Sequence, residues 1–209
     1  MNKSRWEEIL AVSARLFREK GYRATTMDDI AYELNVTKPA LYYYIKTKHD
    51  LLYAICESAV EQLIEGAKQI MSDEGSVEEK LKKLLTWHVS MFSANSDMTT
   101  VYLAEESELP EEKRRFIRDL SREYQDYYRQ LLQQGIDQGL FREIEVPMVV
   151  RAISGMCNWL FDWYRPDGKF SAEEIAGMFF DLVMRGCLKE QAGRKPARTA
   201  RKREPVAAS

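Results

Sequence analysis

The sequence predicts an all-α fold of about nine helices, with a small N-terminal three-helix domain followed by a larger helical domain. Apolar residues recur at the spacing of a helix face along most of the chain, and no segment shows the alternation of a strand. Glycine, proline and capping residues separate the periodic stretches. We place the first domain at residues 1–47, the second at 48–190, and a basic tail at 191–209. The tail should be disordered because it has almost no large apolar residue to bury.

The first domain is expected to hold three helices. Apolar residues at helix spacing run from Trp6 to Phe17 and continue in two shorter stretches up to Tyr44. Each stretch has its own start or stop signal, because small polar side chains cap helix N-termini and proline is tolerated in a first turn. These signals are Gly21 after the first helix, Thr25 or Thr26 before the second, Asn35 in the turn, and Thr37 with Pro39 at the start of the third.

The second domain is expected to hold six further helices. An amphipathic stretch runs from about Lys48 to Met71, and two capping boxes follow, at Ser76 with Glu79 and at Ser171 with Glu174. The remaining helices are expected over about residues 76–93, 98–108, 110–138, 147–164 and 171–189. Residues 165–168 have the composition of a turn.

Composition points to a protein that stays in the cytoplasm. No apolar run approaches the roughly 20 residues that a membrane span needs, and the N-terminus lacks a secretory signal. The three cysteines, Cys56, Cys157 and Cys187, are scattered and odd in number, as expected of buried thiols in a reducing compartment.

Charge is distributed unevenly along the chain. The net charge is −2 overall, +2 over residues 1–50 and +5 over 189–209, which leaves −9 between them. A basic end on an acidic body is expected where one end meets phosphate, although a solvated acidic surface gives the same balance.

Thr25 to Leu52 carries the pattern of a helix-turn-helix. Two short helices would share one buried face through Ile30, Ala31 and Leu41, and the turn at Asn35 is short enough for a sharp crossing. The second helix would expose lysine, alanine and tyrosine side chains, which suit guanine edges, thymine methyl groups and phosphates. A purely structural helical hairpin is the alternative. It leaves the three consecutive tyrosines at residues 42–44 unexplained, because one helix face can bury only part of that run.

These residues closely resemble the DNA-binding domain of TetR-family regulators. The matching positions are Phe17, Gly21-Tyr22, Thr25-Thr26, Ile30-Ala31, Val36 to Lys38, Leu41 to Tyr44, Lys48 and Leu51-Leu52. The chain departs from the family pattern at Ile45-Lys46, where Phe-Pro or Phe-Lys is common, and at Pro39, where glycine is common. The resemblance implies a dimer that binds a palindromic operator of double-stranded DNA, with recognition helices roughly 34 Å apart. It also implies phosphate contacts from Thr26, Thr37, Tyr42 and Lys48, base-edge contacts from Lys38, Ala40 and Tyr43, and packing nearby by Pro39.

The resemblance further implies that residues 48–190 bind a small-molecule effector and form a homodimer. The last two predicted helices each carry an apolar face, and two such helices from each subunit would form a four-helix interface. Glycines at 155, 177 and 186 would allow these helices to approach one another closely. The expected interface residues are Val149, Ile153, Met156, Leu160, Tyr164, Ile175, Phe179, Leu182 and Val183. The alternative is that both faces belong to the core.

An apolar effector pocket is expected from bulky side chains on the middle helices, although such a stripe also suits a core. The candidates are Trp87, Met91, Phe92, Tyr102, Phe116, Tyr124 and Trp159. Residues 155–176 resemble a branch of regulators of fatty-acid and sterol-ring catabolism that respond to acyl-CoA thioesters, which implies an effector of that class. The phosphates of a CoA effector need cations to bind them. The candidates are Arg114, Arg115, Arg118, Arg122 and Arg129, and the alternative is that these arginines form a solvated face of their helix.

An enzyme is not expected. The two histidines, His49 and His88, lie in no cluster with metal-ligand spacing, and no nucleophile elbow or phosphate-binding glycine loop occurs. We therefore expect no metal and no cofactor. The alternative function is that of a helical small-molecule or lipid carrier without a regulatory role. The acidic run at residues 105–108 suits a solvent face or a helix end, and the basic tail could add affinity for DNA phosphate.

Overall fold

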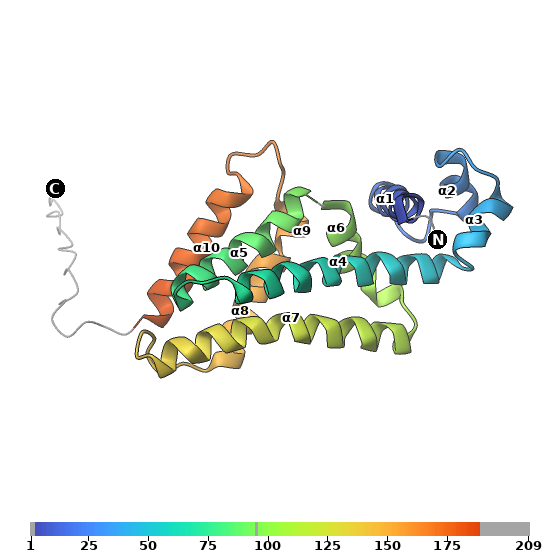
Figure 1. Cartoon of the computed structure of the whole chain (residues 1–209). Helices are drawn as coiled ribbons and strands as arrows, with labels where there is room; N and C mark the ends of the chain where they lie inside the picture. The colour runs from blue at the N-terminus through green and yellow to red at the C-terminus, as the bar shows by residue number, and fades with distance from the viewer. Residues whose placement is uncertain (1–2, 95, 189–209) are drawn as a thin grey trace, which may run out of the picture.

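The computed structural model describes residues 3–94 and 96–188, and these form an all-α fold (Figure 1). Within them no strand is present, and one isolated antiparallel bridge pairs Phe141 with Leu188. The helices are α1 (Lys3–Lys20), α2 (Met27–Glu33), α3 (Lys38–Tyr44), α4 (Lys48–Ser72), α5 (Val77–Ala94), α6 (Ser96–Glu105), the 3₁₀ turn η1 (Glu106–Glu108), α7 (Glu111–Asp137), α8 (Val146–Asn158), α9 (Leu160–Trp163) and α10 (Ala172–Cys187). The basic tail at 191–209 lies outside the described residues, as does Asn95.

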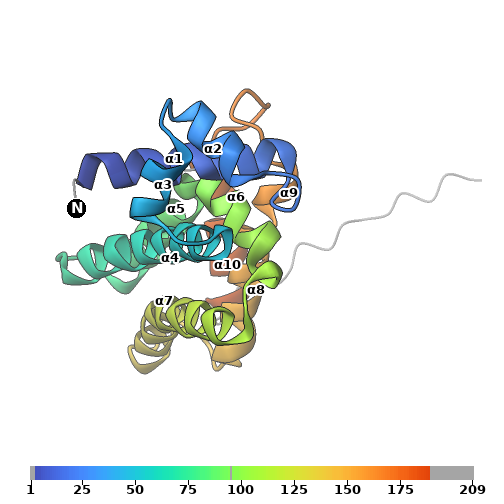
Figure 2. The same ribbon diagram turned by 90° about the vertical axis from the view of Figure 1, so that its right-hand side faces the viewer.

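The first three helices form a head domain (residues 3–47) at one end of the molecule, as Figures 1 and 2 show. Phe17 of α1, Ile30 of α2 and Leu41 of α3 are buried in its centre. The turn between α2 and α3 uses Asn35 with a φ of +52°, a left-handed conformation that asparagine tolerates better than most residues. The predicted three-helix arrangement is confirmed.

The capping signals determine where several helices begin. Thr26 caps α2 in a reciprocal box with Asp29, and Thr37 caps α3 by accepting from the Ala40 N–H. The predicted boxes are also formed: Ser76 exchanges hydrogen bonds with Glu79 before α5, and Ser171 does so with Glu174 before α10. Side-chain oxygens thus satisfy N–H groups that a helix leaves unpaired at its start.

The body domain (residues 48–188) is organised by two long helices, α4 and α7, which lie side by side (Figure 1). Helices α5, α8 and α10 pack on the rest of the core, with α10 against α5. One continuous apolar cluster joins the head and body domains, including Phe17, Leu51, Leu84 and Tyr128.

One predicted helix is wrong in extent. The sequence predicts a single helix over residues 147–164, but α8 ends at Asn158 and α9 occupies Leu160–Trp163. Trp159 stands between them with φ −63° and ψ −12°, so the chain redirects without leaving the right-handed region. The apolar periodicity continues through residues 158–160, so the break between the two helices had no signal in the sequence.

Candidate DNA interface and regulatory regions

Helix α3 presents most of its surface to solvent. Of its own residues only Leu41 is fully buried, and Tyr44 is partly buried. The exposed side chains are Lys38, Pro39, Ala40, Tyr42 and Tyr43. A seven-residue helix anchored by so few apolar contacts holds its shape through the Thr37 cap and the proline in its first turn. It therefore displays a compact polar and aromatic face at the end of the molecule.

The α3 face carries one cation and a prominent aromatic ring. Tyr43 is 85% exposed and its ring meets that of Tyr44 edge-on, with centroids 5.4 Å apart. Ala40 lies three residues before Tyr43, so both occupy one side of the helix. Lys38 Nζ donates to Asp28 Oδ2 at 2.7 Å, and this hydrogen bond raises the pKa of Lys38. The lysine is therefore charged at neutral pH and is oriented by α2.

Lys48 is placed differently from the predicted phosphate contact. Its Nζ donates to the carbonyl oxygens of Tyr22 at 2.8 Å, Arg23 at 3.2 Å and Thr25 at 2.8 Å, and it lies 4.5 Å from the Tyr22 ring centroid. An ammonium has three donors, and all three are used inside the molecule. The prediction for Lys48 is therefore revised: the side chain joins the start of α4 to the turn after α1.

Sequence reasoning missed an exposed aromatic residue next to the turn. Tyr32 on α2 is 86% exposed, and it lines a surface hollow with Glu33, Asn35, Val36 and Thr37. Thr26 and Thr37 are also exposed, although both hydroxyls already cap helices. The sequence contained a signal for this exposure. Ala31 and Leu34 are three residues apart and both buried, so they share one helix face, and Tyr32 lies off that face.

The predicted dimer face needs correction. Ile153, Leu160, Ile175 and Val183 are buried within their own chain, and Val149, Met156, Tyr164 and Phe179 are partly buried. Of the nine predicted residues only Leu182 is well exposed, at 61%. A side chain that is packed in its own core has no surface left for a partner. The large exposed apolar residues of this region are Leu182, which belongs to the predicted set, and Met148, Trp159, Trp163 and Met178, which do not.

The residues predicted for the effector pocket are dispersed over the described part of the body domain. Met91, Phe92 and Tyr124 are buried in the core, whereas Phe116 and Trp159 are 48% and 58% exposed. Trp87 lines a hollow on α4 and α5, Phe92 a separate cavity near α9, and Phe116 a third depression with Tyr53. Tyr102 is partly buried and its hydroxyl lies 2.8 Å from Ser121 Oγ. The correction follows from helical geometry, because the candidates lie on several helices and junctions that face different neighbours.

A buried polar cluster occupies the centre of the body domain. His88 on α5 is buried, its Nε2 lies 3.1 Å from Asn158 Oδ1, and its ring meets that of Tyr124 edge-on. The Tyr128 hydroxyl donates to the Leu84 carbonyl oxygen at 3.2 Å and lies 3.5 Å from His88 Nδ1. Burial lowers the pKa of His88 to about 4, so the imidazole is neutral at neutral pH.

The arginines of α7 lie on a paired, solvent-facing surface. Arg114 pairs with Glu111, Arg122 with Asp119, Arg129 with Asp126, and Arg118 with Glu106. Neighbouring carboxylates thus already balance four of the five arginines proposed for effector phosphates. Among the described residues, no group of three or more His, Cys, Asp or Glu side chains is arranged to hold a metal. None of the described helices is long and apolar enough to cross a bilayer.

Two family models match most of the chain. Residues 9–55 match the model of bacterial regulatory proteins of the TetR family, and residues 74–187 match the C-terminal domain of tetracycline-repressor-like proteins. The chain belongs to the TetR family. It is accordingly a DNA-binding transcriptional regulator, since members of this family are regulators and not enzymes.

Relatives extend over the whole described fold. The repressor KstR2 of Mycobacterium tuberculosis is 26% identical over 90% of this chain and 94% of its own, and its solved structure has a TM-score of 0.82. PfmR of Thermus thermophilus is 34% identical, with a TM-score of 0.80 over 85% of this chain and 97% of its own. AibR, solved with isovaleryl coenzyme A and operator DNA, is 28% identical, with a TM-score of 0.78 over 86% of this chain and 98% of its own.

In this TetR-family chain, polar contacts tie the head domain to α6 and η1. The Arg23 guanidinium donates to both oxygens of Glu108, at distances from 2.8 to 3.2 Å, and the Tyr22 N–H donates to Glu105 Oε1 at 3.3 Å. Arg18 pairs with Asp97 at 3.0 Å. The acidic run that the sequence suggested as a solvent face or helix end does end α6, and it also holds the head domain. Only a structure could reveal this second role, because the paired residues are about 80 positions apart.

Proposed function

We propose that this regulator is a ligand-responsive repressor, which binds a palindromic operator as a homodimer and is released by an acyl-CoA or a related thioester. The observation that carries the DNA-binding part is the exposed α3 face, with Lys38, Ala40 and Tyr43 directed away from the core. Lysine suits guanine edges and phosphates, alanine suits a thymine methyl group, and a tyrosine hydroxyl reaches the backbone. A TetR-family head domain supports the placement of α3 in a major groove.

An uncovered apolar surface supports the homodimer. Met148, Trp159 and Trp163 on α8 and α9, and Met178 and Leu182 on α10, expose large apolar side chains. A Cβ added at Gly155, Gly177 or Gly186 would meet no atom within 4 Å, so a second backbone has room to approach there. Large apolar side chains exposed in such number on neighbouring segments of the chain are typical of a protein interface when they form one surface. A two-fold protein would match a two-fold operator.

The comparisons support the effector class. AibR was solved with both isovaleryl coenzyme A and operator DNA, and this chain resembles it over most of both lengths. KstR2, a ketosteroid transcriptional regulator, is similar over the full described fold. Repression is proposed because KstR2 is a repressor. A regulator that binds operator DNA acts where the DNA is, so the proposal places the protein in the bacterial cytoplasm.

Release would follow from a coupling between the two domains. An effector that prefers a conformer with misplaced α3 helices lowers operator affinity by its differential affinity for the two states. A typical coupling of about 1–3 kcal/mol would weaken operator binding roughly 5–150-fold. Helix α4 begins at the end of the head domain and runs through the body domain, so it is placed to transmit the change.

The test is fluorescence anisotropy of the purified protein on labelled DNA from upstream of its own coding sequence. The double variant Lys38→Ala with Tyr43→Ala should bind at least about tenfold more weakly, while the control Lys68→Ala, an exposed lysine on α4, should bind as the parent does. Unchanged affinity of the double variant would overturn the proposed DNA interface. Weak, sequence-indifferent binding by the parent would favour a carrier.

The effector class is tested separately by adding butyryl-, octanoyl- and palmitoyl-CoA to the preformed complex. At least one thioester should release the DNA, whereas free CoA with no acyl group should release less. If none of the three changes the anisotropy, the thioester part of the proposal is wrong and the DNA-binding part stands.

A further inference from the structure

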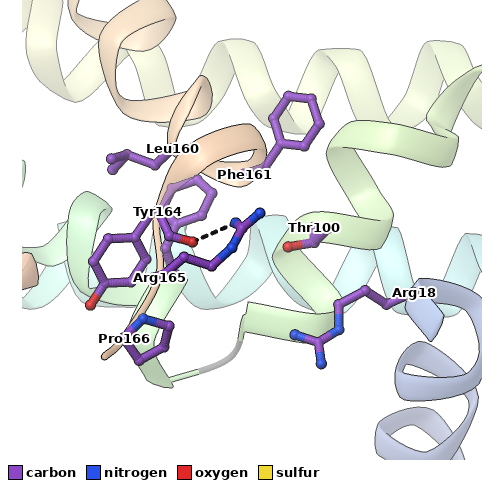
Figure 3. A pocket seen from close by; sticks show the side chains of 8 residues that line it. Arg18, Thr100, Leu160, Phe161, Tyr164, Arg165 and Pro166 are labelled. Carbon is purple, nitrogen blue, oxygen red and sulfur yellow. Dashed lines mark hydrogen bonds between the residues drawn. The ribbon is translucent and has the colours of Figure 1, made fainter. Parts of the chain in front are cut away.

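A cavity of about 300 Å³ lies where the head domain meets the body domain (Figure 3). Arg18 of α1 contributes from the head domain, Thr100 from α6 of the body domain, and Arg165 from the segment that follows α9. Figure 2 shows the end of α1 lying over α6, and α6 in turn packs against α9. Aromatic and aliphatic side chains form the remaining wall: Phe92, Leu160, Phe161, Tyr164 and Pro166.

Two guanidinium groups, those of Arg18 and Arg165, therefore line one small cavity whose remaining wall is mostly apolar. Arg165 makes only local contacts to carbonyl oxygens, donating to Tyr164 at 2.9 Å and to Asp162 at 3.4 Å, and among residues 3–94 and 96–188 no carboxylate pairs with it. Among the same residues, the carboxylate that pairs with Arg18 is that of Asp97, at 3.0 Å. The lining residues thus include two positive groups and no negative one, and Asp97, which is not part of the lining, pairs with Arg18 alone, so a bound anion would offset the charge of Arg165.

From these features we infer that the cavity binds the anionic end of an organic effector, a phosphate or carboxylate joined to an apolar or planar body. Guanidinium groups bind both anions through paired N–H donors. The volume is at the lower end of the range for small-molecule sites, so the cavity takes one end of a larger ligand or a small ligand whole. This inference rests on the proposed function only in identifying the bound molecule as the effector.

The position of Arg18 gives the site a way to act on the head domain. Its ion pair with Asp97 joins α1 to α6, and both side chains are partly exposed, so the pair contributes little to stability. An anion that binds Arg18 would replace Asp97 as its partner. The contact between the two domains would then change at the helix that leads into α2 and α3.

Isothermal titration calorimetry on the full-length protein tests the site with two probes, free CoA and sodium hexanoate. CoA supplies phosphates and hexanoate supplies a carboxylate, so the probe that binds identifies the source of the anion. The Arg165→Gln variant should weaken that binding roughly tenfold, whereas Arg165→Lys, which keeps the positive charge but loses the paired donors, should weaken it less. The control Arg122→Gln removes an exposed arginine of α7 that already pairs with Asp119, and it should bind as the parent does.

A further variant tests the exchange of partners. Asp97→Asn removes the carboxylate that competes for Arg18, so it should strengthen probe binding several-fold. Equal affinity in the parent and Asp97→Asn would overturn the exchange. The site itself is overturned if neither probe binds the parent, or if Arg165→Gln binds as tightly as Arg122→Gln.

The outcomes separate this inference from the proposed function. If the parent binds a probe in an Arg165-dependent way but no thioester releases operator DNA, the cavity stands and the proposed effector class fails. If thioesters release the DNA equally from the parent and from Arg165→Gln, the proposed function stands and the cavity is not where the effector acts.

Discussion

The buried imidazole of His88 should make the stability of this protein depend on pH in a defined window. Its pKa is about 4 in the folded chain, because burial penalises the charged form, against about 6.5 in an unfolded chain. As the pH falls below about 6.5, the unfolded state takes up a proton that the folded state refuses. Stability present above pH 6.5 is therefore lost progressively down to about pH 4, at about 1.4 kcal/mol per pH unit. The loss sums to about 3 kcal/mol from this one residue.

Urea unfolding at fixed protein concentration and ionic strength, from pH 8 to pH 4.5, measures this loss. Carboxylates also titrate in this range, so the informative quantity is the difference between the parent and His88→Gln. That variant keeps a polar side chain beside Asn158 and Tyr128 but cannot titrate, and its stability should fall less with acid by about 2–3 kcal/mol. The chain has one other histidine, the exposed His49, which makes His49→Gln a matched control. Parallel pH profiles for the parent and His88→Gln would refute the reasoning.

Four further variants test the placement of single residues. Leu182→Glu puts a charge on the exposed face of α10. Sedimentation should therefore show a shift from dimer to monomer, and fluorescence anisotropy should show weaker operator binding. An unchanged sedimentation coefficient would mean that Leu182 is not part of the interface. Lys48→Met removes three hydrogen bonds to carbonyl oxygens, so it should lower Tm and leave the salt slope of operator binding unchanged. Lys38→Met removes one cation from each half-site of the proposed dimer, so it should flatten that slope by about 1.8 if both lysines neutralise phosphates. Gly135→Ala would place a Cβ 2.2 Å from the buried Phe141 ring, and thermal melting should show a loss of about 1–3 kcal/mol; an unchanged Tm would mean that the ring moves freely.

The local elements of the head domain could be predicted because each one has its own chemical signal. Thr26 and Thr37 cap helices that follow at once, and Asn35 adopts the left-handed conformation that the short turn requires. These effects act over three or four residues, so they are present in the sequence itself. The resemblance to a known head domain added roles for individual residues, and for Lys48 the structure revises that role.

The body domain shows what local signals leave undetermined. Helices α8 and α10 each carry two adjacent apolar stripes, one through Ile153 and Val183 and the other through Met148 and Met178. Both stripes fit helical periodicity, and only the packing of α5 and α7 determines which one is buried. The residues predicted for the pocket are dispersed for a similar reason, because a bulky side chain such as Met91 suits a core and a cavity equally well.

The contacts between the two domains differ in a way that matters for regulation. Apolar packing joins α1 to α4 within one continuous core, and separating these surfaces would expose Phe17 and Leu51 to water. By contrast, Arg18 with Asp97 and Arg23 with Glu108 are partly exposed ion pairs, which exchange partners at little cost. An effector of ordinary affinity could not pull the core apart, but it could replace one of these pairs. The displacement of the head domain would then be a small rotation about the packed α1–α4 contact. A small rotation is enough to weaken operator binding, because base-edge contacts by α3 require a defined position in the groove.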